Sequence, residues 1–275
     1  MSVPLSILDL APISEGCDAA SALHNTVDLA QHAEQWGYKR YWIAEHHFVA
    51  VASSSPAVLI GQIAAATDRI RVGAAAVQLG QTTAVAVVES FGMLEAFHPG
   101  RIDLGVGRSG QRRREALKDR ESRPKKPKPP KQWRDVDGVI VPPPFDISAL
   151  MRNPRLRAKM SVLQQPEAVA PDFGQQVSDI LAMLDGSYEI DGVDAHATPG
   201  ERAGLAPWVF GSTKGQSAQV AGAHGLPFVA SYHITPAAST SASGAPASAA
   251  GRRSRIARPG RRSPSRPNNG ATSTA

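Results

Sequence analysis

The sequence predicts an α/β fold: a TIM (β/α)8 barrel that is incomplete, with about six parallel strands. Four short apolar segments, residues 5–10, 40–44, 71–77 and 101–106, recur about 30 residues apart, as strands do in successive βα units. Amphipathic segments of helical period fill the gaps between them. Each apolar segment is followed by polar or glycine residues, and the carboxyl ends of barrel strands form the active-site face.

Three helices are expected between these strands. The first spans residues 21–36 and ends at Gly37, a residue type that favours the end of a helix. The second begins at Pro56, because proline is well tolerated in the first turn. The third spans residues 85–97 and is closed by a Pro-Gly pair. Short crossovers of this kind support a parallel sheet.

The βα pattern is interrupted by residues 111–170, which are charged and rich in proline. This length is unusual for a connection, so the insert is either a functional excursion over the active-site mouth or a mobile segment. Within it we expect a short strand at 136–141 and a helix at 147–163. The pattern then resumes with a helix at 173–184, a strand at 208–210, a helix at 217–224 and a strand at 227–231.

We therefore assign residues 1–236 to one barrel domain and residues 237–275 to a disordered tail. The tail has one large aliphatic residue and no aromatic residue, so it cannot bury enough surface to offset its ordering entropy. It is dominated by Ala, Gly, Pro, Arg and Ser, and most of these have GC-rich codons. Because the barrel stops two βα units short of eight, we favour a reading frame lost near Ala237 over a natural basic tail.

Charge and cysteine content limit the choice of partners and compartment. The net charge is +6, but the tail holds seven arginines and no acid, so the remainder is close to neutral and nucleic acid is not an expected partner. Residues 112–134 carry eleven basic and three acidic residues, a pattern typical of a solvated loop and less often of a polyanion site. The single cysteine, Cys17, fits a reducing cytoplasm. No apolar run approaches the ~18 residues that span a bilayer, so no membrane association is expected.

Glu45, His46 and His47 follow the second strand. Adjacent residues at a strand end point to opposite sides, so at most one of the two histidines faces a bound ligand. Its imidazole could exchange a proton with a reacting oxygen near neutral pH. The alternative is a structural histidine satisfied by Glu45. A metal site is less favoured, because no third ligand is apparent.

Two later loops offer contacts for a phosphate. Gly107 allows close approach of the backbone, and Arg108 can pair with a phosphate, although a tight turn with a surface arginine explains the same residues. Ser212 and Thr213 precede the helix that contains Ser217, where hydroxyl and N–H groups can bind an anion. Helix capping by these hydroxyls is the alternative.

Taken in order, these motifs resemble the bacterial luciferase-like flavin-dependent oxidoreductases. The resemblance extends over residues 5–236. Its motifs are RYWIAEHH, IRVGAAAVQLG, FHPGRIDLGVGRSG, WVFGST and GLPFVASYH. Members of that family are TIM barrels that use reduced FMN, or in some branches the deazaflavin F420, and commonly oxidise an aldehyde, alkane or related compound with O2. The family continues for roughly two more βα units, where this chain has its Arg-rich tail.

The resemblance also implies roles for individual residues. His46 matches the catalytic histidine, with Glu45 and His47 as its neighbours. Ala75 and Ala76 match a pair that forms a non-proline cis peptide beneath the flavin ring. Arg108, beside Gly107, matches an arginine near the flavin phosphate. The phosphate-binding segment corresponds to Ser212, Thr213 and Ser217.

The activity implied is that of an FMN-dependent monooxygenase acting on a small molecule. A flavin reductase would supply reduced FMN, and a homodimer is compatible with the family. Two alternatives stay open. One is an F420-dependent dehydrogenase on the same barrel. The other is an inactive truncated remnant, or a protein that binds nucleic acid through its basic tail.

Overall fold

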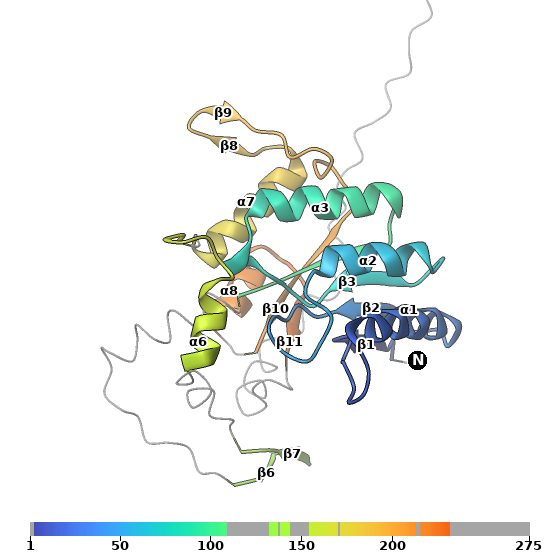
Figure 1. Cartoon of the computed structure of the whole chain (residues 1–275). Helices are drawn as coiled ribbons and strands as arrows, with labels where there is room; N and C mark the ends of the chain where they lie inside the picture. Colours follow the sequence, from blue (N-terminus) through green and yellow to red (C-terminus); the bar gives the residue numbers. More distant parts are fainter. Residues whose placement is uncertain are drawn as a thin grey trace, which may run out of the picture.

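The computed structural model describes residues 3–108, 132–136, 138–143, 154–169, 171–212 and 215–231. The tail expected at 237–275 lies outside these residues, as does the expected insert up to residue 131. The described residues form a curled parallel sheet with helices on its outer face (Figure 1). None of the described helices is long and apolar enough to cross a membrane.

The sheet has the strand order β1-β2-β3-β5-β10-β11, and every pairing along it is parallel. Its strands are β1 (Ser6–Asp9), β2 (Arg40–Ile43), β3 (Arg71–Ala74), β5 (Ile102–Gly107), β10 (Ala206–Gly211) and β11 (Phe228–Ala230). The short β4 (Val77–Gln78) follows β3 and pairs with the far end of β5. The predicted incomplete barrel of about six parallel strands is confirmed.

The helices begin and end where local signals indicate. They are α1 (Ala19–Gln35), α2 (Pro56–Ala65), α3 (Ala84–Phe97), α7 (Phe173–Asp185) and α8 (Gln216–Ala223), with the 3-10 turn η1 (Leu79–Gln81) after β4. Asp18 caps α1 by accepting the N–H of Ser21 at 2.8 Å. Pro56 opens α2, and Gly186 ends α7 in the left-handed conformation.

The region between β5 and α7 differs from expectation. The strand expected at 136–141 is an antiparallel hairpin of β6 (Arg134–Val136) and β7 (Val139–Val141), because Gly138 turns the chain with a φ of +79°. The helix expected at 147–163 is the shorter α6 (Pro154–Ser161) within the described residues. After α7, a second hairpin that was not predicted, β8 (Glu189–Ile190) with β9 (Val193–Asp194), projects from the body (Figure 1).

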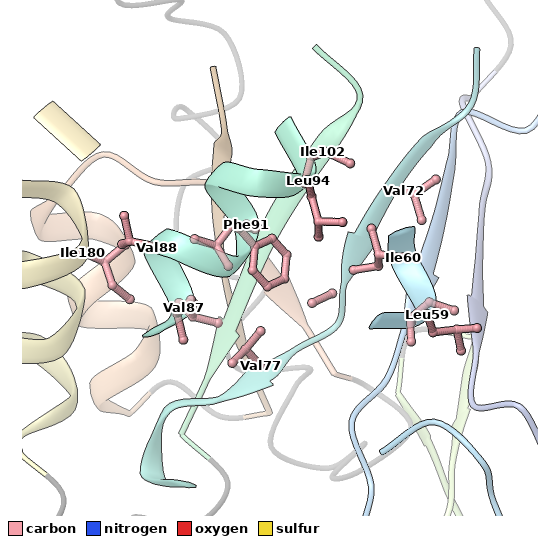
Figure 2. Packing of buried hydrophobic residues seen from close by; sticks show 14 of the residues in the cluster. Leu59, Ile60, Val72, Val77, Val87, Val88, Phe91, Leu94, Ile102 and Ile180 are labelled. Carbon is pink, nitrogen blue, oxygen red and sulfur yellow. The ribbon is translucent and has the colours of Figure 1, made fainter. Parts of the chain in front are cut away.

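The main core lies between the sheet and helices α2, α3 and α7. Figure 2 shows Ile60 of α2, Phe91 of α3 and Ile180 of α7 with Val72 and Val77 of the sheet. All five side chains are buried. Burial of a large apolar side chain contributes about 1.5–3 kcal/mol, so this layer fixes the helices against the strands.

Aromatic side chains pack on the other face of the sheet. The ring of Trp42 meets Trp208 and Phe210 edge to face, with centroid distances of 5.6 and 5.3 Å. Two glycines make room for them. A Cβ atom on Gly73 would lie 2.6 Å from the Trp42 ring, and one on Gly105 would lie 2.6 Å from the Phe210 ring. A side chain at either of these two positions would therefore displace the aromatic cluster.

A buried ionic network joins the amino ends of the strands. Asp103 is fully buried and accepts hydrogen bonds from Arg40 Nε at 3.0 Å and Arg71 Nη2 at 2.7 Å. Trp208 Nε1 also donates to this carboxylate at 3.2 Å, and the Arg40 guanidinium lies 4.9 Å from the Trp208 ring centroid. These residues belong to four adjacent strands, so the network stabilises the end of the sheet opposite the carboxyl ends of the strands.

Glu34 of α1 joins the helix to the loop before β3. Its carboxylate accepts the backbone N–H groups of Asp68, Arg69 and Ile70 at 2.5 to 3.2 Å. Burial opposes ionisation, but these hydrogen bonds outweigh it and lower the pKa of Glu34 below its ordinary value of 4.5. The stabilisation is therefore present above pH 4.5 and is lost as the pH falls through the lower, folded-state pKa.

We expect Glu34→Gln to be less stable than the parent at pH 7, because a neutral amide oxygen accepts hydrogen bonds more weakly than a carboxylate. The difference should shrink as the pH falls below 4.5. Urea unfolding of both proteins between pH 7 and pH 3 measures it. A constant difference across this range would contradict the assignment.

Candidate functional site

The register of the sheet aligns the ends of β2, β4, β5 and β10. Gln78 of β4 and Phe210 of β10 both stand opposite Gly107 of β5. Glu45 follows β2 after one intervening residue, Ala44, and Arg108 directly follows β5. We call this line of strand ends, residues 45–47, 75–78, 107–108 and 211–212, the carboxyl edge. It brings together most of the residues singled out from the sequence.

Glu45 links two parts of the carboxyl edge. Its Oε2 accepts the backbone N–H of Gln78 at 2.9 Å, and its Oε1 lies 3.0 Å from Nε2 of His47. The Gln78 side chain returns a bond to the backbone carbonyl of Glu45 at 2.6 Å. Glu45 therefore holds β4 against the end of β2. A direct part of Glu45 in the chemistry stays a prediction.

The two histidines have different surroundings. His47 is half-buried and bonded to Glu45, so it is His47 that fits the alternative of a structural histidine satisfied by Glu45. His46 is exposed, and its backbone N–H donates to the carbonyl of Ser53 at 2.9 Å. Ser53 is buried, and its hydroxyl donates to the carbonyl of Ala44. The backbone of His46 is thus fixed while its side chain lies at the surface.

Small residues line the middle of the carboxyl edge. The peptide bond between Ala75 and Ala76 is cis, as the resemblance implied for this pair. The N–H of Ala75 donates to the carbonyl of Ile43 at 2.7 Å. A Cβ atom on Gly107 would lie 3.2 Å from the Cβ of Ala76, which is tighter than ordinary contact. Glycine at 107 therefore lets β5 pass close to this pair, and little side-chain bulk stands over the backbone here.

Arg108 is the cation of the carboxyl edge, and its side chain belongs to a hydrogen-bond chain. Its Nη1 donates to Oε1 of Gln216, the first residue of α8. Nε2 of Gln216 donates to Oδ2 of Asp172 at 2.6 Å. Burial opposes ionisation of Asp172, but hydrogen bonds from Gln216 and from the start of α7 outweigh it and lower its pKa. Asp172 is therefore a carboxylate at neutral pH.

The start of α8 completes this end of the site. Its N-cap is Gly215, and no side chain caps it, so neither Ser212 nor Ser217 has the capping role given as the alternative. Both serines are buried. A Cβ atom on Gly211 would lie 2.9 Å from the Cβ of Ser217, so glycine lets α8 pack closely on the end of β10. Thr213, the third hydroxyl expected here, lies outside the described residues.

A buried carboxylate at the end of β1 has a structural role. Asp9 accepts hydrogen bonds from the Thr26 hydroxyl at 2.6 Å, the Tyr41 hydroxyl at 2.7 Å and the Ala11 N–H at 2.8 Å. Burial, and then the bond to Asp9, raise the pKa of Tyr41 far above its ordinary value, so the phenol stays a donor. These partners occupy the carboxylate and fix the first strand end.

Three residues of this region were given no role from the sequence. Gln78 was visible as a polar residue after the third strand, but its bond to Glu45 depends on strand register. Gln216 and Asp172 begin two different helices and meet only in the folded chain. Among the described residues, no three His, Cys, Asp or Glu side chains are grouped as a metal site would require.

A curled parallel sheet with outer helices defines this chain as a barrel-type α/β protein, and its carboxyl edge gathers a cation and several small residues. Residues 3–134 match the model of the luciferase-like monooxygenases, and the chain belongs to that family.

Individual relatives agree. The chain is 36% identical over 234 residues to the uncharacterized protein YvbT of Bacillus subtilis. This match covers 85% of this chain and 56% of YvbT. It is 32% identical over 246 residues to a luciferase-like monooxygenase of Escherichia coli. This match covers 86% of this chain and 57% of that protein. The chain thus spans little more than half the length of these curated relatives.

Two solved structures share the fold. Apo-MsnO8 superposes with a TM-score of 0.62 at 28% identity, covering 86% of this chain and 57% of its own. The oxygenating constituent of 3,6-diketocamphane monooxygenase from Pseudomonas putida, a complex with FMN, superposes with a TM-score of 0.50 at 15% identity. That match covers 90% of this chain and 65% of the other. At that identity the second likeness concerns the fold alone.

Proposed function

We propose that the carboxyl edge binds a flavin or deazaflavin, specifically FMN, and that the chain carries the cofactor-binding part of a monooxygenase acting on a small organic molecule such as an aldehyde or alkane. One observation carries this proposal. The strand register places the small residues Ala75, Ala76 and Gly107 next to the cation Arg108 on one edge. A flat ring and an attached phosphate need these two kinds of surface side by side.

The residues present fit such a cofactor. Low side-chain bulk at Ala76 and Gly107 leaves room for a planar ring system against the backbone. Arg108 and the first turn of α8, with Ser212 and Ser217 buried beside it, offer positive charge and hydrogen-bond donors for a phosphate. Both features belong to the same strand ends. We assign Thr213 to the phosphate end as well, from the resemblance only.

Different side chains of the protein would have different roles in the reaction. When bound and reduced, the flavin supplies the two electrons with which O2 is split, one oxygen atom entering the substrate and the other leaving as water. His46 is assigned proton exchange with the reacting oxygen, and Glu45 and His47 hold the end of β2 beside it. We further propose that a flavin reductase supplies the reduced cofactor. The extent of the barrel domain, residues 1–236 with the insert 111–170, also stays a proposal.

Comparing FMN with riboflavin tests the phosphate assignment, because the two ligands differ only in that group. We expect Arg108→Ala to weaken FMN binding at least about tenfold, as expected for losing a charge-assisted hydrogen bond, and to leave riboflavin binding nearly unchanged. Quenching of flavin fluorescence by the 275-residue chain measures both affinities. Arg155→Ala, on the exposed surface of α6, is the matched control. Equal losses for both ligands would mean that Arg108 acts on something else.

The deazaflavin F420 is the alternative cofactor on this barrel, and it would make the chain a dehydrogenase. The same titration with F420 distinguishes the two. Tighter binding of F420 than of FMN would replace the monooxygenase proposal, whereas selective binding of FMN would support it. Absence of binding to any of the three ligands would favour an inactive remnant.

A further inference from the structure

We infer that Gln216 is a positioning residue for the phosphate end of the site: oriented by Asp172, it holds the guanidinium of Arg108 in the direction from which it binds an oxyanion. This inference rests on the proposed function, because it concerns how Arg108 is presented to the phosphate. It adds a residue that no sequence motif identified. The chain of contacts runs from the start of α7 through the start of α8 to the end of β5.

The orientation of the Gln216 amide follows from its two neighbours. Arg108 has only N–H donors, so it must face the amide oxygen, and the Asp172 carboxylate has only acceptors, so it must face the NH2 group. The reverse orientation would place two donors together and two acceptors together. The amide is therefore fixed in one direction by charged groups of opposite sign.

Asp172 is itself held by the backbone. Its Oδ1 accepts the N–H groups of Gly174 at 2.7 Å and Gln175 at 3.3 Å, and so caps α7. Its other oxygen, Oδ2, faces Gln216. The carboxylate is thus anchored to a helix whose buried face packs in the core. A rigid element thereby fixes Arg108 through two hydrogen bonds.

Holding Arg108 in this way orders a guanidinium, a group whose planar set of N–H donors suits an oxyanion. Its Nη1 donates to Gln216. A long side chain that is already ordered loses less entropy when a ligand arrives. Gln216 is neutral, so its removal changes this ordering without changing the charge near the phosphate. Asp172 is less suitable for a test, because removing its negative charge would by itself favour an anion.

Gln216→Met is the test substitution, because methionine keeps the length of the side chain and its helix propensity but makes neither hydrogen bond. We expect FMN to bind about two- to tenfold more weakly to the 275-residue variant, and riboflavin to bind as it does to the parent. Gln219→Met, an exposed position on the same helix, is the matched control and should change neither affinity.

A double-mutant cycle shows whether Gln216 acts through Arg108. In an Arg108→Ala background, Gln216→Met should have no further effect on FMN affinity. An equal loss in both backgrounds would overturn the inference, as would unchanged or tighter FMN binding by Gln216→Met. If instead Arg108→Ala itself shows no phosphate selectivity, the proposed function fails and not the positioning step alone.

A measurement without ligand keeps the inference testable in that case. The side-chain N–H signal of Arg108 in NMR spectra reports how well its guanidinium is ordered. We expect lower order in Gln216→Met than in the parent and in Gln219→Met. Equal order in all three proteins would show that Gln216 does not hold Arg108.

Discussion

Replacing Asp103 with alanine should destabilise the protein by about 3 kcal/mol, which is a large share of the stability of a typical domain. The substitution removes the acceptor shared by Arg40, Arg71 and Trp208. Breaking a buried ion pair by deleting one partner costs about 3–5 kcal/mol, because charge is left without compensation. The lower value is expected because the Arg40 and Arg71 side chains retain 26% and 25% exposure and can be partly rehydrated.

Urea unfolding followed by circular dichroism measures this loss. Asp103→Asn is an intermediate case, because its oxygen can still accept from Trp208 although the charge is gone, so we expect a smaller loss. Asp28→Ala is the matched control, since this aspartate is 71% exposed and should change stability by less than about 0.5 kcal/mol. Equal stability of Asp103→Ala and Asp28→Ala would show that the network does not hold the strands together.

The network around Asp103 also shows what the sequence could not reveal. Its four residues begin or occupy strands that are recognisable as apolar segments, so the strands themselves were predictable from hydrophobic pattern and spacing. Which side chains meet across those strands depends on register, as in the pairing of Gly73 with Asp103. Turn type fixes the register of a hairpin, but these parallel strands are joined through helices, so no tight turn in the sequence shows which residues pair.

The insert and the loop before β10 show a second limit. The hairpins β6–β7 and β8–β9 consist of strands of two or three residues, too short to give a periodic pattern. Their turns contain glycine at 138 and 192, each with a positive φ. The second turn contains Asp191-Gly192, a pair typical of two-residue hairpin turns, and this pair was the feature of the sequence from which the hairpin could have been predicted. Such turns are recognised from residue type rather than from the hydrophobic pattern.

The candidate site was predictable as far as strand ends define it. Gly107 ends a strand, Arg108 follows it, and Glu45 comes just after another strand, and parallel strands bring their carboxyl ends to one edge. The partners of Arg108 were not predictable, because Gln216 and Asp172 come from the starts of two helices. Spacing also could not separate the two histidines. The bond between His47 and Glu45 does so, and it leads to the following expectation for His46.

His46→Ala should lower the rate of substrate oxygenation at least about 100-fold, the lower end of the effect of losing a general acid or base. The expectation depends on the proposed function. His46 stands at the carboxyl edge with its backbone fixed by Ser53 and its side chain at the surface. Imidazole is the side chain best suited to exchange protons near neutral pH. The affinity for FMN should stay close to that of the parent, because His46 is assigned to the reacting oxygen and not to the phosphate.

The assay supplies the 275-residue chain with FMN, a flavin reductase and a series of aldehydes and alkanes, and measures product formed per bound FMN. His47→Ala is the control, because its ring is bonded to Glu45. Its loss should loosen the join between β2 and β4, and so lower stability more than it lowers the rate per folded molecule. A larger loss of rate in His47→Ala than in His46→Ala would exchange the two roles. Equal rates for His46→Ala and the parent would remove His46 from the chemistry, because a general acid or base cannot be deleted without cost when no other group replaces it.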